Sequence, residues 1–142
     1  MKYFQQGARG THDKDVFGKM MAPMAATLAD NAAIDNVVAY IKTLPDNSAP
    51  GMVKGNATNG QKTYVTCAAC HGPSGRGAQS MNAPVLKGMS DWYLVTQLNN
   101  FKQGIRGAHP KDMYGPQMAS IAAILTNDQA TNDLVAYINT LR

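Results

Sequence analysis

The sequence predicts an all-α protein in which one complete helical domain follows the back half of a second, related domain. Three observations support this prediction. Apolar residues recur with helical spacing in several segments, and no segment alternates convincingly between apolar and polar residues as a half-buried strand does. A gapless internal repeat relates residues 4–44 to residues 101–141. A Cys-X-X-Cys-His motif at residues 67–71 precedes the second copy of the repeat, and no such motif precedes the first.

The repeat predicts the domain organisation. Its two copies are offset by 97 residues, and about half of the aligned positions are identical, far above chance for a gapless run of this length. We therefore predict that residues 1–46 are the C-terminal half of a truncated domain without the Cys-X-X-Cys-His motif. Residues 47–55 are predicted to form a linker, and residues 56–142 a complete domain.

The first copy is predicted to end in an amphipathic helix over residues 30–44. Four of its apolar residues have the spacing of one helix face: Ile34, Val37, Val38 and Ile41. Pro45 forbids continuation of the helix, and a connector rich in Asp, Asn, Ser, Pro and Gly follows.

The complete domain is predicted to open with a helix that Asn56 caps and that runs toward the motif. Gly60 lies inside this helix, where glycine costs roughly 1 kcal/mol relative to alanine, so we expect another helix to cross closely there. Residues 72–89 are rich in Gly and Pro and predict a loop.

Three more helices are expected after this loop. Ser90 is an N-cap candidate for a helix that ends at Lys102, and a short helix is expected over residues 116–125. Thr126 and Gln129 match a capping box that starts the last helix, which runs to about residue 141.

The motif itself predicts a cofactor. Cys67 and Cys70 followed by His71 form the attachment signature of a c-type haem: each thiol adds to one haem vinyl group, and the histidine is held beneath the iron as its proximal ligand. A disulfide, half of a zinc site and a thioredoxin-like pair use similar spacings. The chain has no other cysteine, its other histidines lie far from the motif, and the preceding residues predict a helix rather than a strand. We therefore expect one covalent haem c.

Met118 is the candidate for the sixth iron ligand. Four methionines follow His71, at positions 81, 89, 113 and 118, and only Met118 has a methionine, Met21, at the equivalent position of the repeat. A neutral, soft thioether favours ferrous iron and raises the reduction potential relative to two histidines. His109, which recurs as His12, is the rival ligand.

Other polar residues are candidates for contacts with the haem propionates or with a partner. Trp92, Tyr93 and Arg106 carry donors for the propionates. The candidate partner contacts are Lys87, Lys102 and Lys111. Residues 47–142 hold eight Lys or Arg and four Asp, so the whole formal excess of +4 falls on the haem-bearing part. This charge suits an acidic redox partner. No two Lys or Arg residues are adjacent, which argues against a nucleic-acid partner.

Residues 56–142 resemble a class I cytochrome c domain. The matching stretches are residues 67–72, 83–88, 117–119 and 134–138, together with Gly60 and Tyr64. The resemblance implies that the first and last helices cross near Gly60 and Tyr137. It also implies that the Pro84 carbonyl bonds the outer nitrogen of the proximal histidine, and that Met118 is the distal ligand. With its repeat, the chain resembles tandem dihaem bacterial cytochromes c and the cytochrome c domains fused to cytochrome oxidase subunit II. The missing first haem motif departs from both.

The function expected from these residues is one-electron transfer with His/Met ligation, in a respiratory chain that feeds a terminal oxidase. By itself the chain is not expected to be an enzyme; the resemblance to oxidase subunit II implies that it could form part of such a subunit. The alternatives are a peroxidase-like haem enzyme and a ligand-sensing haem domain, which both need a displaceable sixth ligand.

The expected location is the bacterial periplasm or the periplasmic face of the inner membrane, because covalent haem attachment takes place outside the cytoplasm. Neither a signal peptide nor an apolar run of about 18 residues is visible, so we expect a mature piece of a longer chain. Membrane contact is expected only through a missing anchor or a partner. Residues 1–44 expose apolar side chains that either dock on the haem domain or form a homodimer, which is the outcome we predict.

Overall fold

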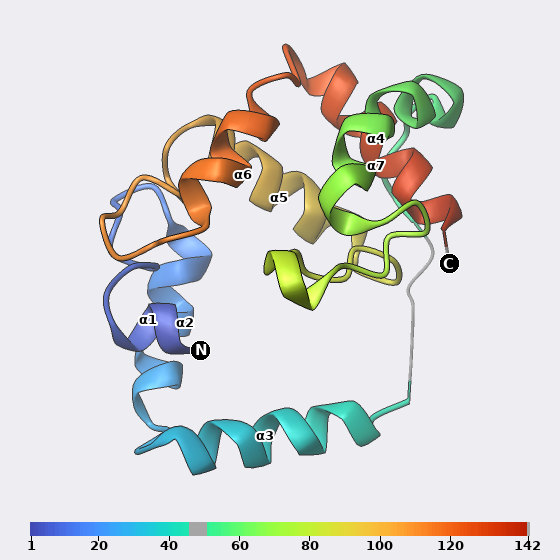
Figure 1. The fold of residues 1–142 in the computed structure, drawn as a ribbon. Coiled ribbons are helices and arrows are strands. Elements are labelled where there is room, and N and C mark those ends of the chain that lie inside the picture. Colours follow the sequence, from blue (N-terminus) through green and yellow to red (C-terminus); the bar gives the residue numbers. More distant parts are fainter. Residues whose placement is uncertain (46–50, 142) are drawn as a thin grey trace.

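The two copies of the repeat lie in two halves of the molecule, as the computed structural model shows (Figure 1). The structure describes residues 1–45 and 51–141. Within these residues the regular structure is helical, apart from an isolated bridge between Ala78 and Ala83. The prediction of an all-α protein is confirmed. No helix in the described part of the chain combines the length and the apolar character that crossing a membrane requires.

Three helices form the first half: α1 (Lys2–Gln5), α2 (Val16–Ala26) and α3 (Asn31–Thr43). The side chain of Asp15 accepts a hydrogen bond from the Gly18 amide at 2.9 Å and caps α2. Asp30 caps α3 in the same way, through the Ala33 amide at 2.8 Å. The predicted helix over residues 30–44 is therefore present from its cap, Asp30, to Thr43, and Leu44 separates it from Pro45.

The second half contains four α-helices and one short 3-10 helix. Their bounds are α4 (Ala57–His71), η1 (Gln79–Met81), α5 (Asp91–Lys102), α6 (Gly115–Ala122) and α7 (Asp128–Thr140). The Asn56 side chain caps α4 by accepting from the amides of Thr58 and Asn59 at 3.0 and 3.2 Å, as predicted. Ser90 occupies the N-cap position of α5, but its side chain makes no capping hydrogen bond.

Helix α6 begins at Gly115, one residue before its predicted start, with Pro116 in its first turn, where a missing N–H costs nothing. It ends at Ala122, three residues before its predicted end. The predicted start of α7 is wrong. Helix α7 is capped by Asn127 rather than Thr126: Asn127 has an extended backbone, and its side chain accepts from the Ala130 amide at 2.8 Å. Gln129, the expected partner in a capping box, instead donates to the Asp133 carboxylate at 2.7 Å.

Helices α4 and α7 cross at Gly60. A Cβ atom at this position would overlap the carbonyl oxygen of Asp133 and lie 2.9 Å from the Cβ of Tyr137, so only glycine allows the observed approach. The rings of Tyr64 and Tyr137 pack beside the crossing, with centroids 5.2 Å apart. The buried core continues from there through Leu94, Leu98, Phe101, Leu125, Leu134, Val135 and Ile138.

The loops that precede α2 and α6 have the same structure, as the repeat predicts. His12 Nδ1 accepts from the Lys14 amide, and His109 Nδ1 accepts from the Lys111 amide, both at 3.1 Å. Each loop also contains a glycine with positive φ, Gly10 at 79° and Gly107 at 86°. A Cβ atom on either glycine would overlap the carbonyl of Gly18 or Gly115, where the following helix begins.

The first half docks on the second through α1, α2 and the loop between them. The Phe17 ring packs against Trp92 with centroids 6.2 Å apart, and Lys111 Nζ donates to the Gln6 carbonyl at 3.2 Å. Helix α3 instead extends away from the other helices (Figure 1). Only Ile34 of this helix is buried, and Ile41 is 55% exposed.

Part of the predicted linker packs against the second half. Residues 46–50 lie outside the described residues. The Asp91 carboxylate at the start of α5 accepts hydrogen bonds from the amides of Met52 and Val53, the latter at 2.6 Å. The Asn56 amide in turn donates to Asp133 on α7 at 2.7 Å. Residues 52–56 are therefore held by α5 and α7.

Candidate haem site

A cavity of about 510 Å³ opens between α4, α5, α6 and the loop around η1. Cys67, Cys70 and His71 enter it from α4, whose geometry places residues three and four apart on the same face. The opposite helix, α6, contributes Met118 and Ile121. The cavity therefore brings the three residues of the motif together with the predicted sixth ligand.

The orientation of His71 is fixed by one hydrogen bond. His71 is buried, and its Nδ1 lies 2.9 Å from the carbonyl oxygen of Pro84. Because a carbonyl only accepts, Nδ1 carries the proton, and Nε2 keeps its lone pair for a metal. A second contact holds the end of α4, where the Tyr64 hydroxyl donates to the Gly72 carbonyl at 2.8 Å.

Both thiols are free and line the cavity. Cys67 is buried and Cys70 half-buried. Burial raises the pKa of the Cys67 thiol, and a hydrogen bond to the backbone has a smaller, opposite effect on this pKa. The thiols and the histidine thus share one wall of the cavity, which is the arrangement that two thioethers and a proximal ligand need.

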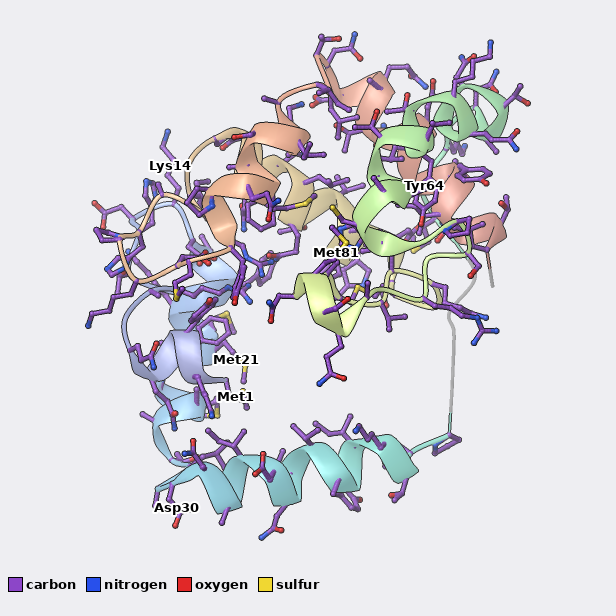
Figure 2. The ribbon with its side chains drawn as sticks, viewed as in Figure 1. Met1, Lys14, Met21, Asp30, Tyr64 and Met81 are labelled. Carbon is purple, nitrogen blue, oxygen red and sulfur yellow. The ribbon has the colours of Figure 1, made fainter. Side chains whose placement is uncertain are left out.

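Three of the four methionines after His71 line the cavity: Met81, Met89 and Met118. Met113 does not line it and is 78% exposed. Met81 lies on η1, only three residues before Pro84, so the chain keeps it near the segment that bonds His71 (Figure 2). Met118 comes from a different helix, α6, and packs against the core.

His109, the rival ligand, does not line this cavity. It lies with His12, Arg9 and Pro110 around a smaller cavity between the two halves, of about 260 Å³. Its Nδ1 is already engaged with the Lys111 amide. The recurrence of this histidine in the repeat therefore corresponds to a shared loop structure.

The predicted propionate contacts lie in two places. Tyr93 and Arg106 line the cavity. Trp92 does not: it is 56% exposed and packs between Phe17 and Tyr93. Arg106 Nη1 donates to Gln97 Oε1 at 2.7 Å, whereas its Nε is buried without a hydrogen-bond partner among the described residues. Burial, followed by repulsion from Arg9, lowers the pKa of Arg106 to about 10.

Two further lining residues, Gln97 and Tyr3, were not among the predicted site residues. Gln97 lies on α5 and carries no sequence signal that marks it. Tyr3 belongs to the first half, so this half contributes directly to the cavity wall. Only knowledge of how the two halves pack could have found it.

The residues around the cavity fit a c-type haem. The cavity is mostly apolar, as the porphyrin faces require, and it holds two thiols and one oriented imidazole on a single helix. At its edge, a buried guanidinium nitrogen without an acceptor is the kind of donor that a propionate satisfies.

Several known proteins are similar to this chain in sequence. The thiosulfate dehydrogenase electron acceptor of Stutzerimonas stutzeri is 31% identical over 137 residues, which cover 89% of this chain and 57% of that protein. Cytochrome c4 of Azotobacter vinelandii is 36% identical over 85 residues, 58% of this chain and 40% of that protein. The cbb3-type cytochrome c oxidase subunit FixP of Bradyrhizobium diazoefficiens is 36% identical over 87 residues, 61% of this chain and 29% of that protein. The chain thus spans between 29% and 57% of the length of these relatives.

Solved structures share the fold. Thiosulfate dehydrogenase (TsdBA) from Marichromatium purpuratum superposes with a TM-score of 0.74 at 29% identity, covering 98% of this chain and 29% of that one. Cytochrome c4 of Acidithiobacillus ferrooxidans gives a TM-score of 0.73 at 23% identity, covering 98% and 79%. The protein-family model described as Cytochrome c matches residues 57–142, the part of the chain that holds the motif and the cavity. The chain belongs to the cytochrome c family.

Proposed function

We propose that the protein is a one-electron carrier whose single covalent haem c is bound through Cys67 and Cys70 and ligated by His71 and Met118. The observation that carries this proposal is the arrangement of the cavity. His71, oriented by Pro84, lies on one wall of the cavity. Met118 comes from a separate helix, α6, which forms another wall of the same cavity. The haem supplies an iron that alternates between ferric and ferrous states.

The protein's own residues have three roles in this function. Pro84 holds the His71 ring by its Nδ1 proton and thereby raises the basicity of Nε2. The apolar walls, including Leu94, Leu98 and Phe101, exclude water from the porphyrin faces. Tyr93 and Arg106, which line the cavity, would donate hydrogen bonds to the propionates. A closed coordination shell on both sides favours electron transfer over substrate binding at the iron.

We infer the cellular context from the relatives and from charge. Relatives include an electron acceptor of thiosulfate dehydrogenase and subunits of cbb3-type oxidases, which supports a role between a periplasmic donor and a terminal oxidase. None of the relatives named here is an oxidase subunit II, so that context lacks support. The excess positive charge of residues 47–142 favours an acidic partner.

The substitution Met118→Ala tests the ligand assignment. The variant is expected to keep its covalent haem but to bind carbon monoxide in the ferrous form and to have a lower reduction potential, because the thioether that favours ferrous iron is lost. Met113→Ala is the matched control, since Met113 is exposed and outside the cavity. Optical spectra and a redox titration of both variants measure the difference. A wild-type protein that already binds carbon monoxide, or a Met118→Ala variant identical to it, contradicts the proposal.

A further inference from the structure

Two arginines, one from each copy of the repeat, meet between the two halves. Arg106 Nη1 donates to Gln97 Oε1 at 2.7 Å, and Arg9 Nη2 donates to the same oxygen at 3.2 Å. Each guanidinium also lies over the phenylalanine of its own copy, Arg9 over Phe4 and Arg106 over Phe101, both at 4.5 Å from the ring centroid. The repeat thus places two equivalent cations on one amide oxygen.

The two arginines have buried donors that are not satisfied. The Nε atoms of both arginines are buried, and neither has a hydrogen-bond partner within residues 1–45 and 51–141. The buried carboxylates that attract Arg106 are Asp15 and Asp112. Each of them accepts a hydrogen bond at 2.9 Å from an amide in the first turn of the following helix, that of Gly18 or Gly115. The two carboxylates therefore attract the pair without a salt bridge to it among the described residues, and both Nε atoms keep a hydrogen-bond position open for a further acceptor.

The arrangement adjoins the haem cavity. Gln97 and Arg106 line that cavity, together with Tyr3 from the first half, whereas Arg9 does not line it and is linked to it through its hydrogen bond to Gln97. Ferric haem carries one more positive charge than ferrous haem. A fixed cation near its edge therefore favours the ferrous form and raises the reduction potential, and the effect is stronger where water is excluded.

We propose that Arg9 of the first half is a positioning and charge-bearing residue of the haem site in the second half. Through Gln97 it holds Arg106 toward the haem propionates, and its charge raises the potential of the haem. This inference rests on the proposed function, because it requires a haem with a reversible couple in the cavity. It makes the first half part of the redox site, although that half has no haem motif of its own.

The test is the midpoint potential of the full chain with its haem attached, measured by spectroelectrochemical titration. Arg9→Gln is expected to lower the potential, and Arg9→Lys, which keeps the charge, is expected to retain most of it. Lys42→Gln is the matched control: it removes one positive charge from the same half, but on α3, which extends away from the site (Figure 1). Its potential is expected to equal that of the wild type. Melting temperatures of all variants show whether the fold is kept.

Two results would overturn the inference: an Arg9→Gln potential equal to the wild type, or equal lowering by Arg9→Gln and Arg9→Lys. If Arg9→Gln does not fold, Arg9→Met takes its place, because it keeps an unbranched side chain and removes the charge. Arg9→Met is expected to lower the potential, and an unchanged potential likewise overturns the inference. A wild-type protein without a reversible couple contradicts the proposed function instead.

Discussion

Single residues of the repeat fall into two groups when their surroundings are compared. His12 and His109 shape their loops. The imidazole of each accepts a hydrogen bond from the backbone amide two residues later, and its backbone carbonyl accepts one from the amide of Asp15 or Asp112. Arg9 and Arg106 instead place two half-buried cations, each with a buried Nε atom, beside the haem cavity. Recurrence alone therefore does not separate a structural residue from a functional one. What distinguishes the two arginines is a buried Nε atom that lacks a hydrogen-bond partner among the described residues.

Gly60 is the residue on which the α4–α7 crossing depends. Gly60→Ala is expected to destabilise the protein by about 2 kcal/mol or more, because the added methyl overlaps the Asp133 carbonyl. This cost exceeds the roughly 1 kcal/mol that alanine gains over glycine in a helix. Thr58→Ala, on the exposed side of the same helix, is the control and should stay within about 0.5 kcal/mol of the wild type. Urea unfolding measures both, and a Gly60→Ala variant as stable as the control would show that the crossing is not tight.

At the scale of elements, α7 is tied to the start of the domain by a carboxylate. Asp133 is buried and accepts from the Asn56 amide and the Gln129 side chain, each at 2.7 Å. These hydrogen bonds, the Asn56 amide first, hold the pKa of Asp133 below its ordinary value of 3.8. A carboxylate whose pKa is lowered by folding stabilises the fold above its unfolded pKa, and this contribution is lost as the pH falls through the folded value.

Asp133→Asn is therefore expected to destabilise the protein at pH 7, and the difference from the wild type should shrink as the pH falls below about 4. The protonated carboxyl and the amide are both neutral, so little separates the two proteins once Asp133 has bound its proton. Asp128→Asn, an exposed acid in the first turn of the same helix, is the control. Thermal melts between pH 7 and pH 3 measure the effect, and a difference independent of pH would contradict it.

The elements also show what the sequence could and could not predict. Periodicity and side-chain chemistry predict a helix that starts after Asn56 and one that ends at Lys102, because these features depend on nearby residues; the structure has them at residues 57–71 and 91–102. The cap of α7 was misplaced by one residue, although Asp30, the repeat equivalent of Asn127, marks the position. The positions of Gln97 and Tyr3 at the cavity could not be predicted, since they depend on how the two halves pack. Trp92 was expected at the haem and lies instead against Phe17, for the same reason.

At the scale of the whole molecule, α3 and α7 are equivalent in sequence but not in surroundings. Val135 and Ile138 of α7 are buried in the core of the second half, which forms around α4. Their equivalents on α3, Val38 and Ile41, are exposed, and α3 extends away from the other helices (Figures 1 and 2). The first half docks on the second through α1 and α2, and this docking leaves the apolar face of α3 uncovered.

We predict that this face pairs with the same face of a second copy at high protein concentration. Four exposed apolar side chains form it: Val38, Tyr40, Ile41 and Leu44. Burying one such side chain contributes roughly 1.5–3 kcal/mol, and a surface that pairs with itself gives a closed two-fold dimer. The double substitution Val38→Asp and Ile41→Asp is expected to keep the protein monomeric, whereas Val65→Asp, at an exposed valine on α4, should leave association unchanged. Sedimentation velocity over a range of concentrations measures this. A wild-type chain that stays monomeric throughout that range would exclude pairing through α3.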